Sequence, residues 1–245
     1  MIKHLEYFEK TKEILEQIEK NCSKNIESAA ELFSKAIMEN RRIFLFGTGH
    51  SHMLAEELFY RAGGLLNIQP VLIEELMLHI DASGSTLAER KEGLAQQIFE
   101  DYRMSAGDVI VIISNSGRNG VVIDMALLCK QKGLSVIALT SLNHSNAGLS
   151  RHNSGKRLWE LADVVLDNCG CNGDACISID NIDGKICATS TVAGAFILNS
   201  IVAGAVELCA QKGFYPDHFC SANVDGGDEI NNKLIEKYKK EIKHL

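Results

Sequence analysis

The sequence of 245 residues contains no block of basic residues, and its formal net charge is −7 at pH 7. Nucleic acids and acidic membranes select for clustered lysine and arginine, so this charge balance argues against both as partners. A small anionic ligand remains compatible, because a local site need not share the sign of the whole protein. The sequence also has no run of eighteen apolar residues, and its N-terminal residues are charged, unlike a secretory signal. We therefore expect a cytoplasmic protein.

The eight cysteines lack the pairing that a structural zinc site uses. Such sites commonly use paired C-x2-C spacings, whereas the densest group here is Cys169-x-Cys171-x4-Cys176-x10-Cys187. Without a signal peptide, a disulfide framework is not expected either. We predict reduced thiols and neither a metal nor another cofactor, with a zinc site as the weaker alternative. Two further cysteines, Cys129 and Cys209, fall at apolar helical positions and read as small core residues.

No composition break or linker divides the chain, and 46% of its residues are hydrophobic, as in an ordinary globular domain. Because predicted strands alternate with predicted helices, the fold class is α/β: a three-layer αβα sandwich with a five-stranded, mostly parallel, doubly wound sheet. Pro70 places the second strand at an edge of the sheet or at the strand's start. The expected strands are 43–46, 68–73, 109–113, 134–139 and 164–166, with a further short strand near 177–179.

Residues 1–40 form a predicted helical arm that precedes one compact domain, 41–245. The arm should contain two helices, the second of them capped by Ser23 or Asn25. A DNA-reading helix-turn-helix would need a third helix and matching basic residues, and neither is evident. Later helices are expected over 51–62, 87–104, 121–132, 158–161, 189–211 and 228–242, and the one at 189–211 is apolar on nearly all sides, which predicts burial.

The first strand runs into Gly47-Thr-Gly-His-Ser51, after which a helix begins. A strand–loop–helix junction of this kind presents free backbone N–H groups and the positive end of the helix dipole, and both favour an anion. Gly47 and Gly49 permit close backbone approach, and Ser51 adds a hydroxyl at the helix N-cap. A serine-capped turn without a ligand would account for this stretch equally well.

A second junction follows the strand at 109–113, with the sequence Ser114-Asn-Ser-Gly-Arg-Asn119. Both loops should lie at the carboxyl ends of parallel strands, where ligands bind in such sheets. Neither loop is a Walker P-loop, because Gly-Lys-Ser/Thr is absent, and His52 stands where a dinucleotide fingerprint has its third glycine. Serine-rich turn chemistry could explain the second loop alone. Two such loops at equivalent places instead predict a phosphate site.

These two junctions resemble the sugar isomerase (SIS) domain, which binds phosphosugars. The family's first loop, Gly-x-Gly-x-Ser, is matched by Gly47 to Ser51, and its second, Ser-x-Ser-Gly-x-Thr/Asn, by Ser114 to Asn119. Over the whole chain the resemblance is closer to the UPF0309 group of SIS proteins, through the segments 47–53, 75–79, 152–156 and 221–227. The resemblance implies that a phosphosugar is bound by Gly49, Ser51, Ser114, Asn115, Ser116, Gly117, Asn119, Thr140 and Ser141.

The resemblance fixes the ligand class better than the reaction. Moving a proton between C1 and C2 of a sugar requires a base, and usually a polar group that steadies the enediolate. The candidate catalytic residues are Glu75, His79, His152, Lys156 and His50, each of which could also be an ordinary surface or loop residue. Heptose-phosphate isomerases of the superfamily use a carboxylate on the first-loop helix, but Arg61 stands ten positions after Ser51 here. That particular activity is therefore not expected.

We accordingly expect a phosphosugar-binding enzyme, an isomerase or a related lyase, in preference to a non-catalytic phosphosugar sensor. A regulator would normally carry a separate DNA-binding domain, and the N-terminal arm is too small for one. We also expect a homodimer or homotetramer, because the helix at 189–211 and the arm offer apolar faces to a second copy.

Overall fold

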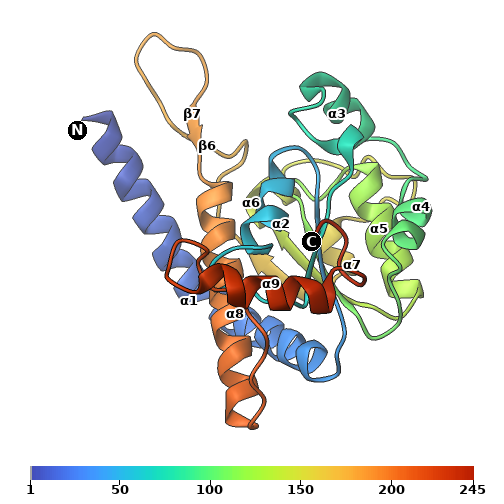
Figure 1. Ribbon diagram of the computed structural model, residues 1–245. Helices are drawn as coiled ribbons and strands as arrows, with labels where there is room; N and C mark the ends of the chain where they lie inside the picture. Colours follow the sequence, from blue (N-terminus) through green and yellow to red (C-terminus); the bar gives the residue numbers. More distant parts are fainter. Residues whose placement is uncertain (1) are drawn as a thin grey trace.

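A computed structural model describes residues 2–245 of the chain. Its main sheet has five parallel strands in the order β2-β1-β3-β4-β5, with helices on both faces, so the predicted αβα architecture is confirmed (Figure 1). The strand β2 is an edge strand, as Pro70 indicated. The strands are β1 (Ile43–Gly47), β2 (Ile68–Val71), β3 (Val109–Ile113), β4 (Ser135–Thr140) and β5 (Val164–Asp167).

Side chains alternate between the two faces of this sheet and build one apolar core on each. Ile43 and Leu45 join the core that is completed by α1 (Lys3–Met38), α2 (Met53–Leu58) and α8 (Ser190–Gln211). Phe44 and Phe46 point into the opposite core. That second core is completed by α3 (Ala82–Ala88), α4 (Ala95–Asp101), α5 (Gly120–Gln131) and α7 (Leu158–Leu161). Burial on both faces explains the continuous β-branched run of β3.

The N-terminal arm is one continuous helix, α1, so the prediction of two helices was wrong. The residues read as helix caps are satisfied in other ways. Ser23 donates its hydroxyl to the carbonyl of Glu19 one turn earlier, and the Asn25 amide donates to the Val165 carbonyl of β5, 2.6 Å away. Because tertiary contact and back-bonding serve these polar groups, they do not end the helix.

The single helix predicted over 87–104 was also wrong, because two short helices, α3 and α4, occupy this region. Asp81 caps α3 by accepting from the N–H groups of Ser83 and Gly84. Between the two helices Gly93 has φ +98° and donates its N–H to Asp124 on α5. This left-handed glycine breaks the helix there.

The remaining elements flank the sheet. The C-terminal tail after α9 (Gly227–Tyr238) covers the edge strand β2, because the Gln69 side chain accepts from the Lys243 N–H at 2.7 Å and donates to the Lys243 carbonyl oxygen at 3.2 Å. Such cover protects an exposed sheet edge. Figure 1 shows the β6–β7 hairpin projecting beside the N-terminal end of α1. These smaller elements are η1 (Gly49–His52), η2 (Glu74–Leu76), α6 (Leu142–Asn146), β6 (Ala175–Ile177), β7 (Ile186–Ala188) and α9 (Gly227–Tyr238).

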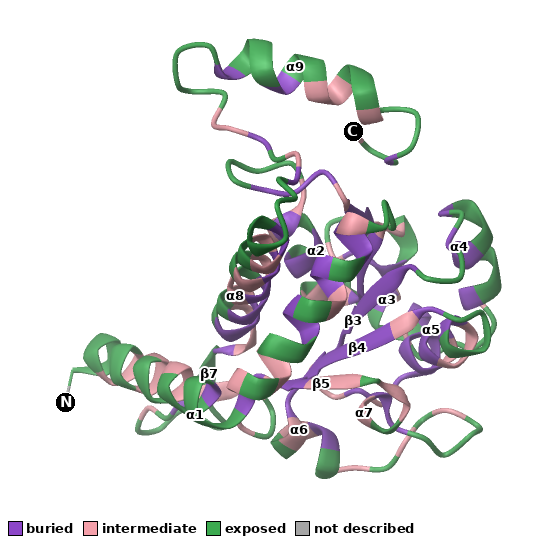
Figure 2. Ribbon diagram, turned by 90° about the horizontal axis from the view of Figure 1, so that it is seen from below, coloured by how far each residue is buried: buried purple, intermediate pink, exposed green. Residues whose placement is uncertain are grey.

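The helix α8 is less buried than its composition suggested. It packs against α1 and α2, yet only 39% of its most apolar stretch is buried. Val192 and Phe196 are 43% and 40% exposed on its outer side, and Figure 2 shows exposed residues along both α1 and α8. By length and composition alone α8 could cross a membrane, but a single such helix is weak evidence, and core helices pass the same test.

Candidate functional site

The first loop leaves β1 through a turn that only glycine permits. A Cβ atom on Gly47 would lie 2.7 Å from the carbonyl carbon and oxygen of Ser51, and Gly49 has φ +55°. The helix that follows is shorter than predicted, with the 3-10 turn η1 leading into α2. Ser51 therefore lies inside η1, and Thr48 takes the N-cap position. The loop brings Ser51 and His50 into one pocket.

The second loop is shaped by its own serine. Ser114 accepts the N–H of Gly117 at 3.1 Å, and Gly117 has φ +54° in a space bounded by Ser145 and Thr140. Asn119 is the N-cap of α5. Within residues 2–245, the backbone N–H groups of Ser116, Arg118 and Asn119 donate to no protein acceptor. Three free donors at the start of a helix suit an anion.

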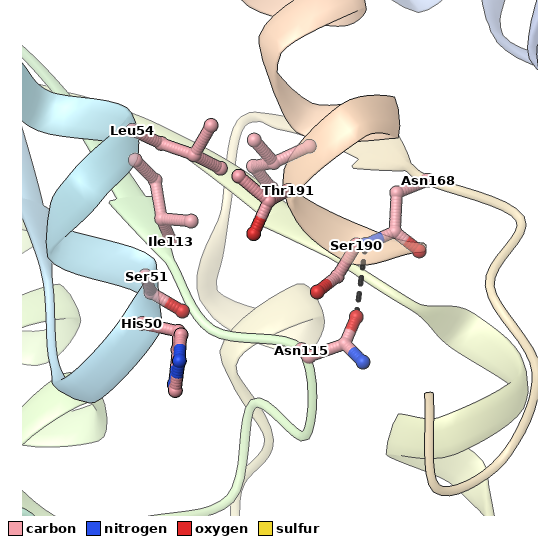
Figure 3. A pocket seen from close by; sticks show the side chains of 9 residues that line it. His50, Ser51, Leu54, Ile113, Asn115, Asn168, Ser190 and Thr191 are labelled. Carbon is pink, nitrogen blue, oxygen red and sulfur yellow. Dashed lines mark hydrogen bonds between the residues drawn. The ribbon is translucent and has the colours of Figure 1, made fainter. Parts of the chain in front are cut away.

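The ends of β4 and β5 support this loop. Asn115 accepts from the Ser141 N–H and from the Thr140 hydroxyl, both at 3.2 Å, through its carbonyl oxygen. Its side-chain oxygen accepts from the amide of Asn168 at 2.8 Å, the bond drawn in Figure 3. Ser141 itself caps α6 and donates to the Gly170 carbonyl. Thr140 and Ser141 are fully buried, so their contacts hold the loop in place.

A pocket lies between the two loops and the start of α8 (Figure 3). Sequence reasoning missed three of its polar residues: Asn168, which follows β5, and Ser190 and Thr191 in the first turn of α8. The hydroxyl run Thr189–Thr191 before an apolar helix was the available signal. Asp174 holds this helix start by accepting from the N–H groups of Thr189 and Ser190. The lining is His50, Ser51, Leu54, Ile113, Asn115, Leu139, Asn168, Ser190 and Thr191.

A carboxylate joins the two loops. Glu89 follows α3 and accepts from the Thr48 hydroxyl at 2.7 Å and from the Asn119 amide at 2.8 Å. Arg151 donates to the side-chain oxygen of Asn119 at 3.0 Å. Thr48 and Asn119 are buried, whereas Glu89 is half-buried. The residues that bridge the loops, Thr48 and Glu89, were absent from the sequence-based site.

Guanidinium groups gather beside the second loop. Burial, followed by the charge of Arg118, lowers the pKa of both Arg151 and Arg157. Burial also lowers the pKa of His144, and Arg118 adds to that effect. The positive charges of Arg118, Arg151 and Arg157 favour an anion here despite the negative net charge of the chain.

The candidate catalytic residues are dispersed around the loops. His50 lines the pocket, and the His79 ring lies 6.2 Å from the ring of His52 in η1. Glu75 is exposed in η2. Lys156 is exposed, with its ammonium 3.9 Å from Glu160. The fold thus places His50 in the first loop and His79 beside it, and all four of His50, Glu75, His79 and Lys156 are exposed.

The buried His152 side chain connects the 150–156 segment to α5 by a hydrogen bond to Asp124. Its Nδ1 accepts from the Ser154 N–H at 2.9 Å, so Nε2 carries the proton and donates to Asp124 at 2.9 Å. Glu92, Asp124 and His152 together have the donor types and spacing of a metal site. A neutral histidine ligand would need its Nε2 free, and the backbone N–H at Nδ1 opposes that tautomer. The hydrogen bonds therefore account for this cluster without a metal.

All eight cysteines are free thiols. Burial raises the pKa of Cys129 to about 12 and that of Cys169 to about 11, so both thiols are poorly nucleophilic. Cys176 and Cys187 face each other across the β6–β7 hairpin. Cys209 is fully buried, as its helical position indicated.

Comparison with known proteins decides the family. The model of the SIS domain matches residues 6–141. The chain belongs to the SIS-domain family. Within it, the chain is 48% identical over 236 residues to a UPF0309 protein of Geobacillus sp. (strain WCH70), covering 96% of both chains, so it belongs to the UPF0309 group. This confirms the family resemblance that the sequence analysis drew.

Two solved structures share the SIS fold at low sequence identity. A phosphoheptose isomerase from Francisella tularensis has a TM-score of 0.52 and 17% identity, covering 83% of this chain and 96% of its own. The sugar isomerase domain of an RpiR transcription factor from Sphaerobacter thermophilus has a TM-score of 0.52 and 14% identity, covering 98% and 99%. At these identities the likeness establishes the fold.

Proposed function

We propose that this SIS protein binds a phosphorylated sugar between its two loops and catalyses its isomerisation or a related lyase step. The observation that carries the proposal is the convergence of two strand–loop–helix junctions at the carboxyl edge of the sheet. Ser51 and Asn115 line the common pocket, and three free N–H groups lie in the second loop. Hydrogen bonds to a charged acceptor such as phosphate contribute about 1.5–3 kcal/mol each.

The sugar would extend from the phosphate towards the start of α8. Ser190 and Thr191 border that side of the pocket, and Asn168 beside them donates to Asn115 of the second loop at 2.8 Å (Figure 3). His50 is the titratable side chain that lines this pocket, and the His79 ring lies 6.2 Å from that of His52 in the same loop. These two histidines are therefore the first candidates for moving a proton, ahead of Glu75, His152 and Lys156.

A non-catalytic phosphosugar sensor is the second candidate. The solved RpiR domain is named as part of a transcription factor, and its fold matches nearly the whole of this chain. A sensor built on this fold would pass the bound state of its ligand to a partner protein. Both candidates require the same ligand class, so binding and turnover must be tested separately.

Binding is tested by a thermal-shift screen with hexose, aminosugar and heptose phosphates, and with the unphosphorylated sugars as controls. A ligand at one hundred times its dissociation constant stabilises the protein by about 2.7 kcal/mol. Ser116→Ala should lose the shift, whereas Ser28→Ala, on the exposed side of α1, should keep it. Stabilisation by unphosphorylated sugars alone, or undiminished binding by the Ser116 variant, would contradict the site.

Turnover is tested by incubating the hit in deuterated water. Exchange at C2 of the sugar that is lost in His50→Gln or His79→Gln supports the isomerase. A ligand that binds without exchange or cleavage supports the sensor. Parallel His152→Gln and Glu75→Gln variants assign any remaining base.

We also propose that the protein is a cytoplasmic homodimer or homotetramer. Apolar residues on α1 and α8 face solvent, among them Phe8 at 62% exposed and Phe196 at 40%. Between these helices Ile26, Ala30 and Leu208 line a groove. Exposed apolar surface of this kind commonly marks an interface. Sedimentation should give an oligomer that Phe196→Glu dissociates, and a wild-type monomer at micromolar concentration would exclude the assembly.

A further inference from the structure

Glu89 joins side chains of the two loops to which the proposed function assigns the phosphate. Its carboxylate accepts one hydrogen bond from each loop, from the Thr48 hydroxyl at 2.7 Å and from the Asn119 amide at 2.8 Å. Thr48 and Asn119 are 7% and 6% exposed, so their donors are presented mainly to this carboxylate. A phosphate oxygen and a carboxylate oxygen accept the same donors with similar geometry.

The backbone of the same segment covers the start of α5. The Glu89 carbonyl accepts from the Val121 N–H at 3.2 Å. A Cβ on Gly120 would lie 2.4 Å from the carbonyl oxygen of Lys91, which shows how closely the segment packs there. Carbonyl oxygens are electronegative and stabilise the positive end of a helix dipole as a bound anion would. The backbone and the side chain of this segment thus occupy the Val121 N–H and the side-chain donors of Thr48 and Asn119, beside the free N–H groups of the second loop.

The surroundings of Glu89 are cationic. Arg151 donates to Asn119 from the opposite side of the amide, at 3.0 Å. Arg118 and Arg90 lie close enough to lower the pKa of Arg151, whereas Glu89 opposes that change. With Glu89 withdrawn, the cluster would hold an excess of positive charge beside the loops. A phosphate dianion would neutralise it more fully than one carboxylate does.

We propose that Glu89 is an internal competitor for the phosphate group: it closes the two-loop cradle in the free protein and must swing away when a phosphosugar binds. This rests on the proposed function, because it concerns the same site. The consequence is that Glu89 lowers the apparent affinity of the protein for phosphate. Only molecules whose Glu89 side chain is withdrawn bind phosphate, and the apparent affinity falls with that fraction.

The proposal is tested by isothermal titration with inorganic phosphate and with the sugar phosphate found in the screen. Glu89→Gln keeps an oxygen for Asn119 but removes the charge, so both ligands should bind about tenfold more tightly, the factor that separates a charge-assisted from a neutral hydrogen bond. Glu100→Gln is the matched control. It removes the same charge from exposed α4, where Glu100 contacts Gln96, and should leave affinity unchanged.

A second variant tests the position. Thr48→Val removes the hydroxyl with little change in shape, and in the Glu89→Gln background it should weaken phosphate binding about tenfold. Thermal unfolding of every variant, without ligand, confirms that the fold is intact. If Glu89 only braces the loops, Glu89→Gln will bind phosphate no better than wild type, or more weakly, and that result overturns the competitor role.

The outcomes also separate this idea from the proposed function. Wild-type binding that the Glu89→Gln change does not tighten refutes the competitor and leaves phosphosugar binding standing. Binding by Glu89→Gln that exceeds wild type supports both. Absence of binding by wild type and variant alike refutes the phosphate site itself, and the competitor with it.

Discussion

The replacement of Gly47 by alanine is the sharpest test of the first loop. The new Cβ would lie 2.7 Å from the carbonyl carbon and oxygen of Ser51 and 2.8 Å from its Cβ. The first two of these atoms are backbone, so no rotation of a side chain relieves the contact, and the loop itself must move. Because Ser51 lines the pocket, the same displacement should disturb the binding site.

The magnitude follows from the cost of overpacking, which is about 1–3 kcal/mol and occasionally more. Because the new Cβ meets backbone atoms that cannot rotate away, we expect the upper value, about 3 kcal/mol. For a chain of this size each kcal/mol lowers Tm by about 2–4 °C, so Gly47→Ala should melt about 6–12 °C below wild type. Its affinity for the phosphosugar should fall at least about tenfold, the equivalent of 1.4 kcal/mol.

Differential scanning fluorimetry and a ligand titration measure both effects. The control is Gly213→Ala, in the turn after α8, where φ is +73° but no heavy atom lies within 4 Å of the added Cβ. This variant should lose only about 1–2 kcal/mol of stability, the cost of a non-glycine residue in the left-handed region, and its ligand affinity should be unchanged. If Gly47→Ala melts with wild type, or binds the phosphosugar equally well, the close packing of this loop is not what shapes the site.

Three further predictions concern Asp174, His152 and His144, whose side chains lie around the site. Asp174→Ala should destabilise the protein by about 1–2 kcal/mol in urea unfolding by uncapping α8, and Asp174→Asn should restore most of it. His152→Ala should cost about 1–3 kcal/mol because it leaves Oδ1 of Asp124 without its imidazole donor, while Oδ2 keeps the Gly93 N–H; unchanged stability would show that this bond does not stabilise the fold. Burial lowers the pKa of His144 in the folded state, so the unfolded chain binds this proton more readily. The free energy of unfolding should therefore fall as the pH drops below 6.5, and it should fall less steeply in His144→Gln. Equal pH dependence of the two proteins would show that His144 does not contribute.

The two short loops could be read from the sequence because their chemistry is local. A buried strand, a glycine turn and hydroxyls recur at Gly47–Ser51 and Ser114–Asn119, and a parallel sheet brings both to one edge. The apolar strands specified the sheet for the same reason, since a continuous apolar run such as β3 needs cover on both faces. The family followed from the same residues.

What the sequence misjudged depended on contacts distant along the chain. Asn25 has the chemistry of a helix cap, yet its partner is Val165 of β5, which no local pattern reveals. Likewise, Gly93 alone is weak evidence of a break until Asp124 holds its N–H. Local propensity is a weak prior that such tertiary bonds override.

The sequence by itself determined the αβα sheet and the two loops that face one edge, because strand burial and turn chemistry act over a few residues. Only the tertiary structure placed Ser190 and Thr191 at the pocket, and only it set Glu89 between Thr48 and Asn119. Glu89 is forty-one positions from Thr48 in the sequence, and the two meet only because α3 and α5 pack on the same face of the sheet.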